Sequence, residues 1–247
     1  MKQMKKRLMA FAMLLLAAPF LPAQTVTGTD AADSLGLASE KMTFPRWRLS
    51  VQGGGAYRSG QMDPSLDGIM LQHAKRLRWG AVYGADATYY FTQTWGAGLQ
   101  YSNMRSFNRE RVEASYDDGS SRSGFLESRI DVAYMGPMLS ARMLSPDGRH
   151  ALIGNYGAGY VSYREAGEVI EAYSIRGWTV GFRMELGYEW RLNGRLSLGV
   201  LLSATSGVLY DLEMTDSAGG RQTVKLDRDE AENLSRLALS VGLRWNL

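Results

Sequence analysis

The sequence predicts an all-β fold, an eight-stranded antiparallel up-and-down transmembrane β-barrel, and three observations predict it. Large apolar residues recur at every second position in eight separate runs, which is the side-chain period of a strand and not of a helix. The connections between the runs alternate between long and short. The tryptophans lie at the ends of the runs. Together these features favour a barrel with apolar side chains on its outside and small or polar side chains inside.

The first 24 residues predict a secretory signal peptide. Basic residues from Lys2 to Arg7 precede an apolar run over residues 8–21, and Pro-Ala-Gln follows as a cleavage site. The apolar run is shorter than the roughly 20 residues of a membrane-spanning helix, so we expect a cleaved signal and not an anchor. Residues 25–45 are small and polar without a sustained period, which predicts a flexible N-terminal segment. The barrel domain is then expected over residues 46–247.

Charge and composition exclude several classes of protein. The chain has 28 Lys and Arg against 25 Asp and Glu; the signal peptide holds four of the basic residues and none of the acidic ones, which leaves 24 against 25. The basic excess therefore belongs to the signal, and nothing indicates binding to nucleic acid. The absence of cysteine excludes disulfides, thiolate chemistry and cysteine-based zinc sites.

Eight strands are predicted, each bounded by turn or loop residues. Pro137 lies inside the fourth run and removes a ladder hydrogen bond, so we expect a bulge there. In the fourth run we expect the apolar phase to consist of Ile130, Val132, Tyr134 and Met138. The runs occupy residues 47–57, 79–91, 95–103, 129–139, 151–163, 178–190, 196–204 and 237–247.

The connections predict which end of each strand faces which side of the membrane. Short turns occupy residues 92–94, the segment around Ser145 to Arg149, and the Asn193-Gly194 hairpin turn. The other connections are long. Short turns on one side and long loops on the other are typical of bacterial outer-membrane barrels, and an even strand number places both chain ends on the short-turn side.

Three details indicate that the apolar phase faces lipid and not a soluble core. No lysine lies in any of the eight runs, whereas a water-facing surface of this size would carry several. The chain ends on a strand whose Trp245 and Leu247 lie in the apolar phase. All six tryptophans lie in that phase at strand ends, where they predict two aromatic girdles: Trp47, Trp95, Trp190 and Trp245 at the short-turn end, Trp79 and Trp178 at the long-loop end.

The polar phase of the strands predicts an interior ion-pair network. In residues 178–190 the charges Arg183, Glu185 and Glu189 alternate with the apolar residues and should point into the barrel. Charges withdrawn from water need partners, and the interior of eight strands is narrow enough for them to meet. We therefore expect a plug and no steady pore. The predicted members are Asp86, Arg183 and Glu185 near mid-depth, Asp131 somewhat above them, and Arg48, Glu189 and Arg244 near the periplasmic end.

The signal peptide, the eight runs, the loop alternation and the terminal strand resemble one family, the small eight-stranded outer-membrane barrels of the OmpA transmembrane domain and OmpX. The resemblance covers residues 46–247 and is one of pattern, not of a site motif. It implies an exported, outer-membrane protein with a structural or surface-interaction role, in envelope integrity, adhesion or binding through long loops. An outer-membrane lipid-modifying enzyme and a soluble periplasmic barrel that binds an apolar ligand are the two alternatives.

The candidate chemistry is sparse, and no catalytic, cofactor-binding or metal-binding residue is expected. The two histidines, His73 in the first long loop and His150 beside a short turn, are expected at opposite membrane faces. The acidic residues between Asp227 and Glu232 lack the spacing of a calcium loop and are expected to be a solvated charge run. Glycine-rich stretches lack the ending of a phosphate loop.

The expected partners are outer-membrane lipid, lipopolysaccharide and an extracellular surface ligand, with the protein itself a monomer. Three cations just before Trp79, namely Lys75, Arg76 and Arg78, are candidate contacts to lipopolysaccharide phosphates. The segments 109–132 and 208–226 continue the strand pattern around central turn residues, which predicts two hairpins that project beyond the lipid and offer edges to a partner.

Overall fold

A computed structural model describes residues 44–60, 68–115, 121–169, 171–217, 219–227 and 231–247 of the chain. The predicted signal peptide and nearly all of the predicted flexible segment lie outside these residues. No helix in the described part is long and apolar enough to cross a membrane. The elements are β1 (Trp47–Arg58), α2 (Gly68–Leu77), β2 (Trp79–Tyr90), β3 (Trp95–Ser115), β4 (Ser121–Leu144), β5 (His150–Val169), β6 (Glu171–Arg191), β7 (Leu196–Ser206), β8 (Val208–Leu209), β9 (Asp211–Thr215), β10 (Arg221–Lys225), β11 (Glu232–Asn233) and β12 (Arg236–Asn246).

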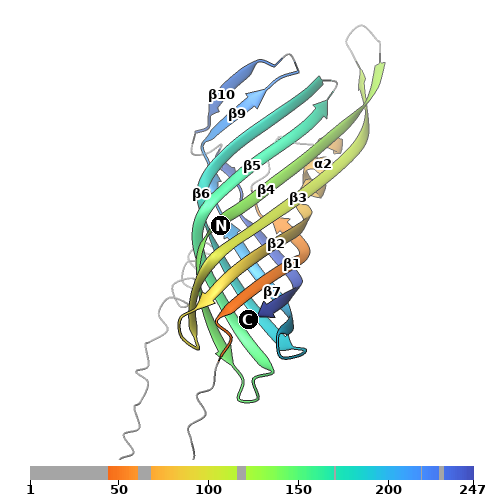
Figure 1. Ribbon diagram of the computed structural model, residues 1–247. Helices are drawn as coiled ribbons and strands as arrows, with labels where there is room; N and C mark the ends of the chain where they lie inside the picture. The colour runs from red at the N-terminus through yellow and green to blue at the C-terminus, as the bar shows by residue number, and fades with distance from the viewer. Residues whose placement is uncertain (1–43, 61–67, 116–120, 170, 218, 228–230) are drawn as a thin grey trace, which may run out of the picture. The chain divides into compact units, whose positions relative to one another are not determined.

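Eight of the strands close into an antiparallel barrel (Figure 1). Each strand from β1 to β6 pairs with the next strand along the chain, β7 pairs with β12, and β12 pairs back with β1. The first and last residues of the barrel meet at the short-turn end, where Trp47 and Leu247 exchange two backbone hydrogen bonds of 3.0 and 2.8 Å. The predicted fold class is therefore confirmed.

The outside of the barrel is apolar, as a lipid-facing wall requires. On β6 the exposed fraction is 64% at Trp178, 65% at Val180 and 64% at Leu186, whereas the intervening Arg183 and Glu185 are buried. The same alternation holds along β1, β7 and β12. A soluble carrier would present the polar phase to water, so this alternative is wrong.

Strand β4 has the opposite phase to the one expected from its sequence. Ile130, Val132 and Tyr134 are buried inside the barrel, and the outward residues are those of odd number, including Met135 and Leu139 at 59% and 56% exposed. Both phases of this strand contain large apolar residues, so the period of two fixes the alternation but not which set faces lipid.

The outer half of the interior is consequently apolar and not polar. The cluster includes residues from α2, β4, β5, β8 and the loop before β12, and it fills the barrel above the charged layer described below. Its members are Leu77, Ile130, Val132, Tyr134, Val161, Tyr163, Leu209 and Leu234, with Ile175 and Leu212 packed against them.

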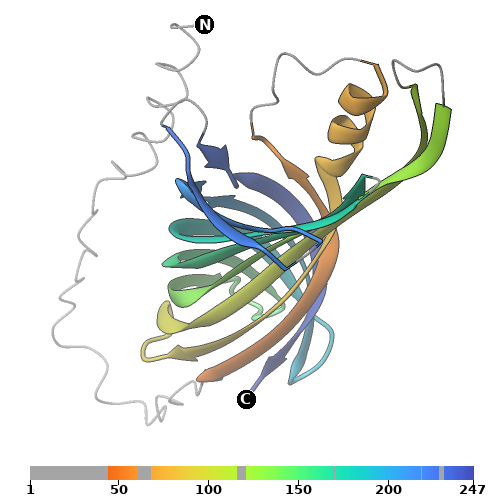
Figure 2. The same cartoon turned by 90° about the horizontal axis from the view of Figure 1, so that it is seen from above.

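Four neighbouring strands, β3 to β6, form a raised wall on one side of the barrel (Figures 1 and 2). They have 21, 24, 20 and 21 residues, whereas β1, β2, β7 and β12 have 12, 12, 11 and 11. About 9–11 residues suffice for a tilted strand to cross a membrane, so the wall continues beyond the lipid at the long-loop end.

The two predicted hairpins are both present as paired strands. The register of β3 and β4 continues without a break up to Ser115 and Ser121, although the turn between them lies outside the described residues. β9 pairs with β10, and the Asp216 and Gly220 backbones close the turn between them, with Gly219 at φ 84°. The expected bulge at Pro137 is absent, because the β3–β4 register passes through Leu99↔Pro137 unchanged.

Candidate functional site: a filled interior and a capped outer mouth

The periplasmic half of the interior is held together by Arg48. Its guanidinium donates to Asp86 at 2.8 Å and to Glu189 at 3.0 Å, and the Arg48 side chain is 1% exposed. The Ser50 hydroxyl also donates to Asp86. Strand alternation explains the arrangement, because Arg48 and Ser50 are the inward residues of β1 while Trp47 and its odd-numbered neighbours face lipid.

Arg244 joins the same cluster from β12, the strand that pairs with β1. Its Nε lies 3.3 Å from Glu189, and its Nη1 donates to the carbonyl oxygens of Gly199 at 3.0 Å and Gly242 at 2.6 Å. A Cβ at position 199 would lie 2.7 Å from the same guanidinium, so a larger residue there would require Arg244 to shift. One carboxylate thus receives two arginines from strands that are distant in the sequence.

A second cluster at mid-depth is centred on Arg183 and Glu185. The guanidinium donates to Glu185 at 3.0 and 2.7 Å and to the Thr205 hydroxyl at 2.8 Å. Asn155 donates to the other oxygen of the same carboxylate at 2.8 Å. Every charge in the two clusters has a partner of opposite sign, as charges withdrawn from water require.

Six of the seven predicted network residues are brought together in this way, and Asp131 is not. Its expected inward position was wrong, because it lies in the outward phase of β4. The Asp131 side chain is 23% exposed and accepts from Arg105 Nε on the outer surface of β3 at 2.7 Å. The inverted phase of β4 explains the error.

Two further buried arginines were missed from the sequence. Arg142 donates from Nε to the Gln93 carbonyl at 3.2 Å and lies 3.7 Å from the centre of the Tyr90 ring. Arg236 donates to the backbone carbonyls of Val132 and Ser102. Arg236 shares the parity of Arg244 on β12, and that signal could have identified it from the sequence.

The helix α2, over residues for which the sequence predicts a loop, packs against the inward side chains of β3 and β4 at the outer mouth. Its buried His73 lies with Nε2 3.0 Å from Ser128 Oγ and Nδ1 2.8 Å from Asn108 Nδ2. The Asn108 amide also donates to Glu110 at 3.1 Å, which fixes its nitrogen on the histidine side. Nδ1 is then an acceptor, so Nε2 carries the proton and donates to Ser128.

The directions of these hydrogen bonds differ from those in a catalytic pair of serine and histidine. A histidine that activates a serine must accept the hydroxyl proton on one nitrogen while a partner accepts from the other. Here both hydrogen bonds run in the opposite direction. His73 and Ser128 are also only 5% and 3% exposed, so the contact attaches α2 to the wall.

Attachment of α2 is expected to weaken in acid. Burial lowers the pKa of His73 from its usual 6.5, although Glu110 and Glu165 oppose the shift; Arg76 adds to it. When the helix detaches, the pKa of His73 returns to its ordinary value. The stabilisation of the attached helix is therefore complete above about pH 6.5, and it is lost as the pH falls from there through the lowered pKa. Over that interval the detachment equilibrium should rise about tenfold per pH unit.

Hydrogen exchange of residues 68–77 between pH 8 and 5, corrected for intrinsic rates, measures this effect. His73→Gln keeps a donor toward Ser128 and does not titrate, so its protection should be independent of pH. A wild-type helix with equal protection at both pH values would contradict a role for His73 protonation.

The remaining predicted residues are placed as follows. Arg78 donates to the carbonyls of Arg58 and Gly60, and Arg76 lies 3.3 Å from Glu110, whereas Lys75 is exposed. His150 lies at the short-turn end of β5, with Nδ1 2.7 Å from Tyr188 Oη. No cluster of three or more candidate metal ligands occurs among the described residues. The six tryptophans of the proposed girdles are 49–65% exposed: Trp47, Trp79, Trp95, Trp178, Trp190 and Trp245.

Comparisons with known proteins bear on the fold. No protein-family model and no curated protein sequence matches the chain. Among solved structures, the outer membrane protein OprG from Pseudomonas aeruginosa is 15% identical with a TM-score of 0.54, and the alignment covers 83% of this chain and 97% of OprG. A major outer membrane protein from Thermus thermophilus is 12% identical with a TM-score of 0.50, covering 81% of this chain and 99% of that protein. The chain thus has the fold of a small eight-stranded outer-membrane barrel, which implies the bacterial outer membrane.

Proposed function

We propose that this protein acts at the cell surface, with the filled barrel as its membrane anchor and the raised wall of β3 to β6 as its interaction surface. The observation that carries the proposal is the length of these four strands, which continue well beyond the span of the lipid. A barrel that served only as an anchor would not need them.

The wall offers a free strand edge to a partner. β2 pairs with β3 only as far as Arg105, and no other described strand pairs with that edge of β3 above this residue. Unpaired N–H and C=O groups on such an edge accept an added strand from a partner. Phe107 and Phe125, 54% and 49% exposed, lie on the outward face of the same hairpin and would supply apolar contacts.

Shortening this hairpin tests the proposal. Replacement of residues 108–128 by an Asn-Gly turn joins Phe107 to Arg129, which are register partners, and leaves the lower barrel intact. We expect cells that produce this variant to lose adhesion to host-cell or matrix surfaces while the variant keeps its heat-modifiable gel mobility. A matched control replaces residues 212–224 by the same turn and shortens only β9 and β10.

The outcomes separate adhesion from a purely structural role. Loss of adhesion with the first variant and not with the control would support the wall as the interaction surface. Unchanged adhesion combined with envelope leakage in the deletion strain would instead favour a role in envelope integrity alone. Lipopolysaccharide remains a proposed partner of Lys75, Arg76 and Arg78. Arg76 and Arg78 would bind it through the donors that their present contacts leave free.

The alternative function is that of a lipid-modifying enzyme. The observation that suggests it is the contact of 3.0 Å between His73 and Ser128. The direction of the hydrogen bonds argues against it. Comparison of outer-membrane lipids from strains with the wild type and with Ser128→Ala decides the matter: a lipid product that disappears with this substitution would favour the enzyme.

A further inference from the structure

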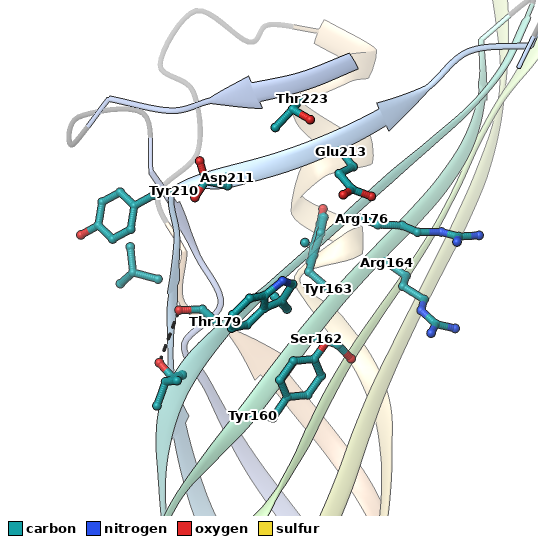
Figure 3. Close-up of a pocket in the computed structure, with 14 residues that line it drawn as sticks. Tyr160, Ser162, Tyr163, Arg164, Arg176, Thr179, Tyr210, Asp211, Glu213 and Thr223 are labelled. Atoms are coloured by element: carbon teal, nitrogen blue, oxygen red, sulfur yellow. Dashed lines mark hydrogen bonds between the residues drawn. The ribbon is translucent and has the colours of Figure 1, made fainter. Parts of the chain in front are cut away.

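Two arginines face each other on the outside of the wall, just above the aromatic girdle. Arg164 on β5 and Arg176 on β6 are direct register partners, and both side chains are exposed. Figure 3 shows the two guanidinium groups side by side, extending in the same direction from neighbouring strands. Like charges directly opposite each other in an antiparallel pair destabilise a sheet, unless a group of opposite charge lies between them.

The chain itself does not supply that group in its described part. Asp131 is the register partner of Arg164 on the other side, but its carboxylate is bound by Arg105 at 2.7 Å and by Asn103 at 3.2 Å. Glu213 is the register partner of Arg176 on β9 and lines the same pocket as Asp211, but neither carboxylate forms an ion pair with Arg164 or Arg176. Neither Arg164 nor Arg176 lies within ion-pair distance of a described carboxylate, so both retain free donors.

The arginines line a pocket of about 500 Å³. It forms beside an irregularity in the sheet: β6 pairs with β7 up to Phe182↔Ser206 and with β9 from Arg176↔Glu213, so residues 177–181 lie opposite the longer segment 207–212. β8 within this segment pairs with β11 and not with β6, so the ladder is interrupted there and leaves room beside the two guanidinium groups.

Below the arginines the same pocket becomes aromatic. Trp178 and Tyr160 stack with ring centroids 5.8 Å apart and an interplanar angle of 25°, and they are 64% and 46% exposed. Trp178 is two residues from Arg176 on the same face, a distance of roughly 6–7 Å along the strand. Because aromatic girdles mark the interface between lipid and water, the arginines lie at the depth of lipid headgroups.

We propose that this pocket binds the phosphorylated headgroup of an outer-leaflet lipid. The phosphate bridges Arg164 and Arg176, whose planar guanidinium groups match its oxygens, and Ser162, which lines the pocket beside them, offers a hydroxyl. The remainder of the headgroup and the start of the acyl chains lie against Trp178, Tyr160 and Val180. The site lies on β5 and β6 of the raised wall, away from the free edge of β3, and does not include the cations of α2.

The test uses the folded full-length barrel in an uncharged maltoside detergent. A soluble short-chain phosphatidic acid is titrated, and binding is measured by native mass spectrometry and by the shift in unfolding temperature. Arg164→Gln combined with Arg176→Gln should weaken binding at least tenfold. The matched control, Arg109→Gln combined with Arg129→Gln, removes the same charge from the same wall and should change binding less than threefold.

Two further measurements distinguish a binding site from a structural pair. Without lipid, the Arg164→Gln/Arg176→Gln variant should unfold at the same temperature as the wild type or a higher one, because the repulsion is gone. Inorganic phosphate at the same concentration should give no shift, since it lacks the part that contacts the aromatic rings. Equal binding by wild type and variant, a less stable variant without lipid, or equal stabilisation by inorganic phosphate would each overturn the proposal.

Discussion

Replacement of Arg48 by alanine is expected to lower the free energy of unfolding of the barrel by roughly 3–5 kcal/mol, the cost of breaking a fully buried ion pair. Arg48 is 1% exposed and binds Asp86 and Glu189 at 2.8 and 3.0 Å. Its removal leaves Asp86 with hydroxyl partners only and Glu189 with Arg244 alone. Denaturant titration of the detergent-solubilised protein, followed by the gel mobility of unheated samples, measures the loss.

The outward ion pair of Arg105 and Asp131 provides the matched control. These side chains are 50% and 23% exposed, and their separation of 2.7 Å resembles that of the buried pair. Arg105→Ala should therefore cost clearly less stability than Arg48→Ala, because water screens an exposed ion pair. Equal losses for Arg48→Ala and Arg105→Ala would contradict the interpretation that burial, and not contact distance, makes the interior network important.

A double variant separates lost attraction from stranded charge. Arg48→Met combined with Asp86→Asn removes one charge of each sign and leaves the contact between Glu189 and Arg244 in place. Its loss of stability should be smaller than the sum of the two single losses by about 1–3 kcal/mol, since neighbouring members of a network are not additive. Strict additivity would mean that the two residues act independently.

The second large effect concerns conduction: the wild-type barrel is expected to show no large, stable conductance steps in planar-bilayer recordings. Two layers close the interior. The ion pairs of Arg48 and Arg183 fill the lower part, and the apolar cluster around Tyr134 fills the upper part. An eight-stranded barrel leaves only enough internal space for side chains.

Removal of one of the two layers should enlarge the rare, small openings of the barrel without producing large, stable conductance steps. Arg183→Ala deletes the guanidinium that binds Glu185 and Thr205 and leaves a carboxylate facing the space, so such openings should favour cations. Combination with Tyr134→Ala, which opens the apolar layer above, should raise their conductance further, whereas Tyr134→Ala alone should have little effect. Large stable steps from the unaltered protein would refute the filled interior.

The architecture was predictable from the sequence because each of its determinants is local. Residues 178–190 alternate strictly between apolar and polar positions, and the structure places Trp178 and Leu186 outward and Arg183 inward as that alternation requires. Closely spaced turn residues such as Asn193 and Gly194 fixed the short connections. The positions of Arg48, Asp86 and Glu189 inside follow from the same period of two, without knowledge of their partners.

Other features depend on which surfaces the closed barrel brings together. The helix α2 is stabilised mostly by tertiary contacts, through His73 to β3 and β4 and through Leu77 to the apolar cluster, so its sequence by itself predicts a loop. The neighbouring strands decide which phase of β4 faces lipid, since both of its phases contain large apolar residues.

By itself, therefore, the sequence determined the strands, their alternation and the closed barrel, because a side-chain period of two and turn chemistry act within a few residues. Only the tertiary structure decided that Asp131 faces out, that the upper interior is apolar, and that Arg164 and Arg176 lie opposite each other. These arrangements depend on strand register, which sets neighbours that are distant along the chain.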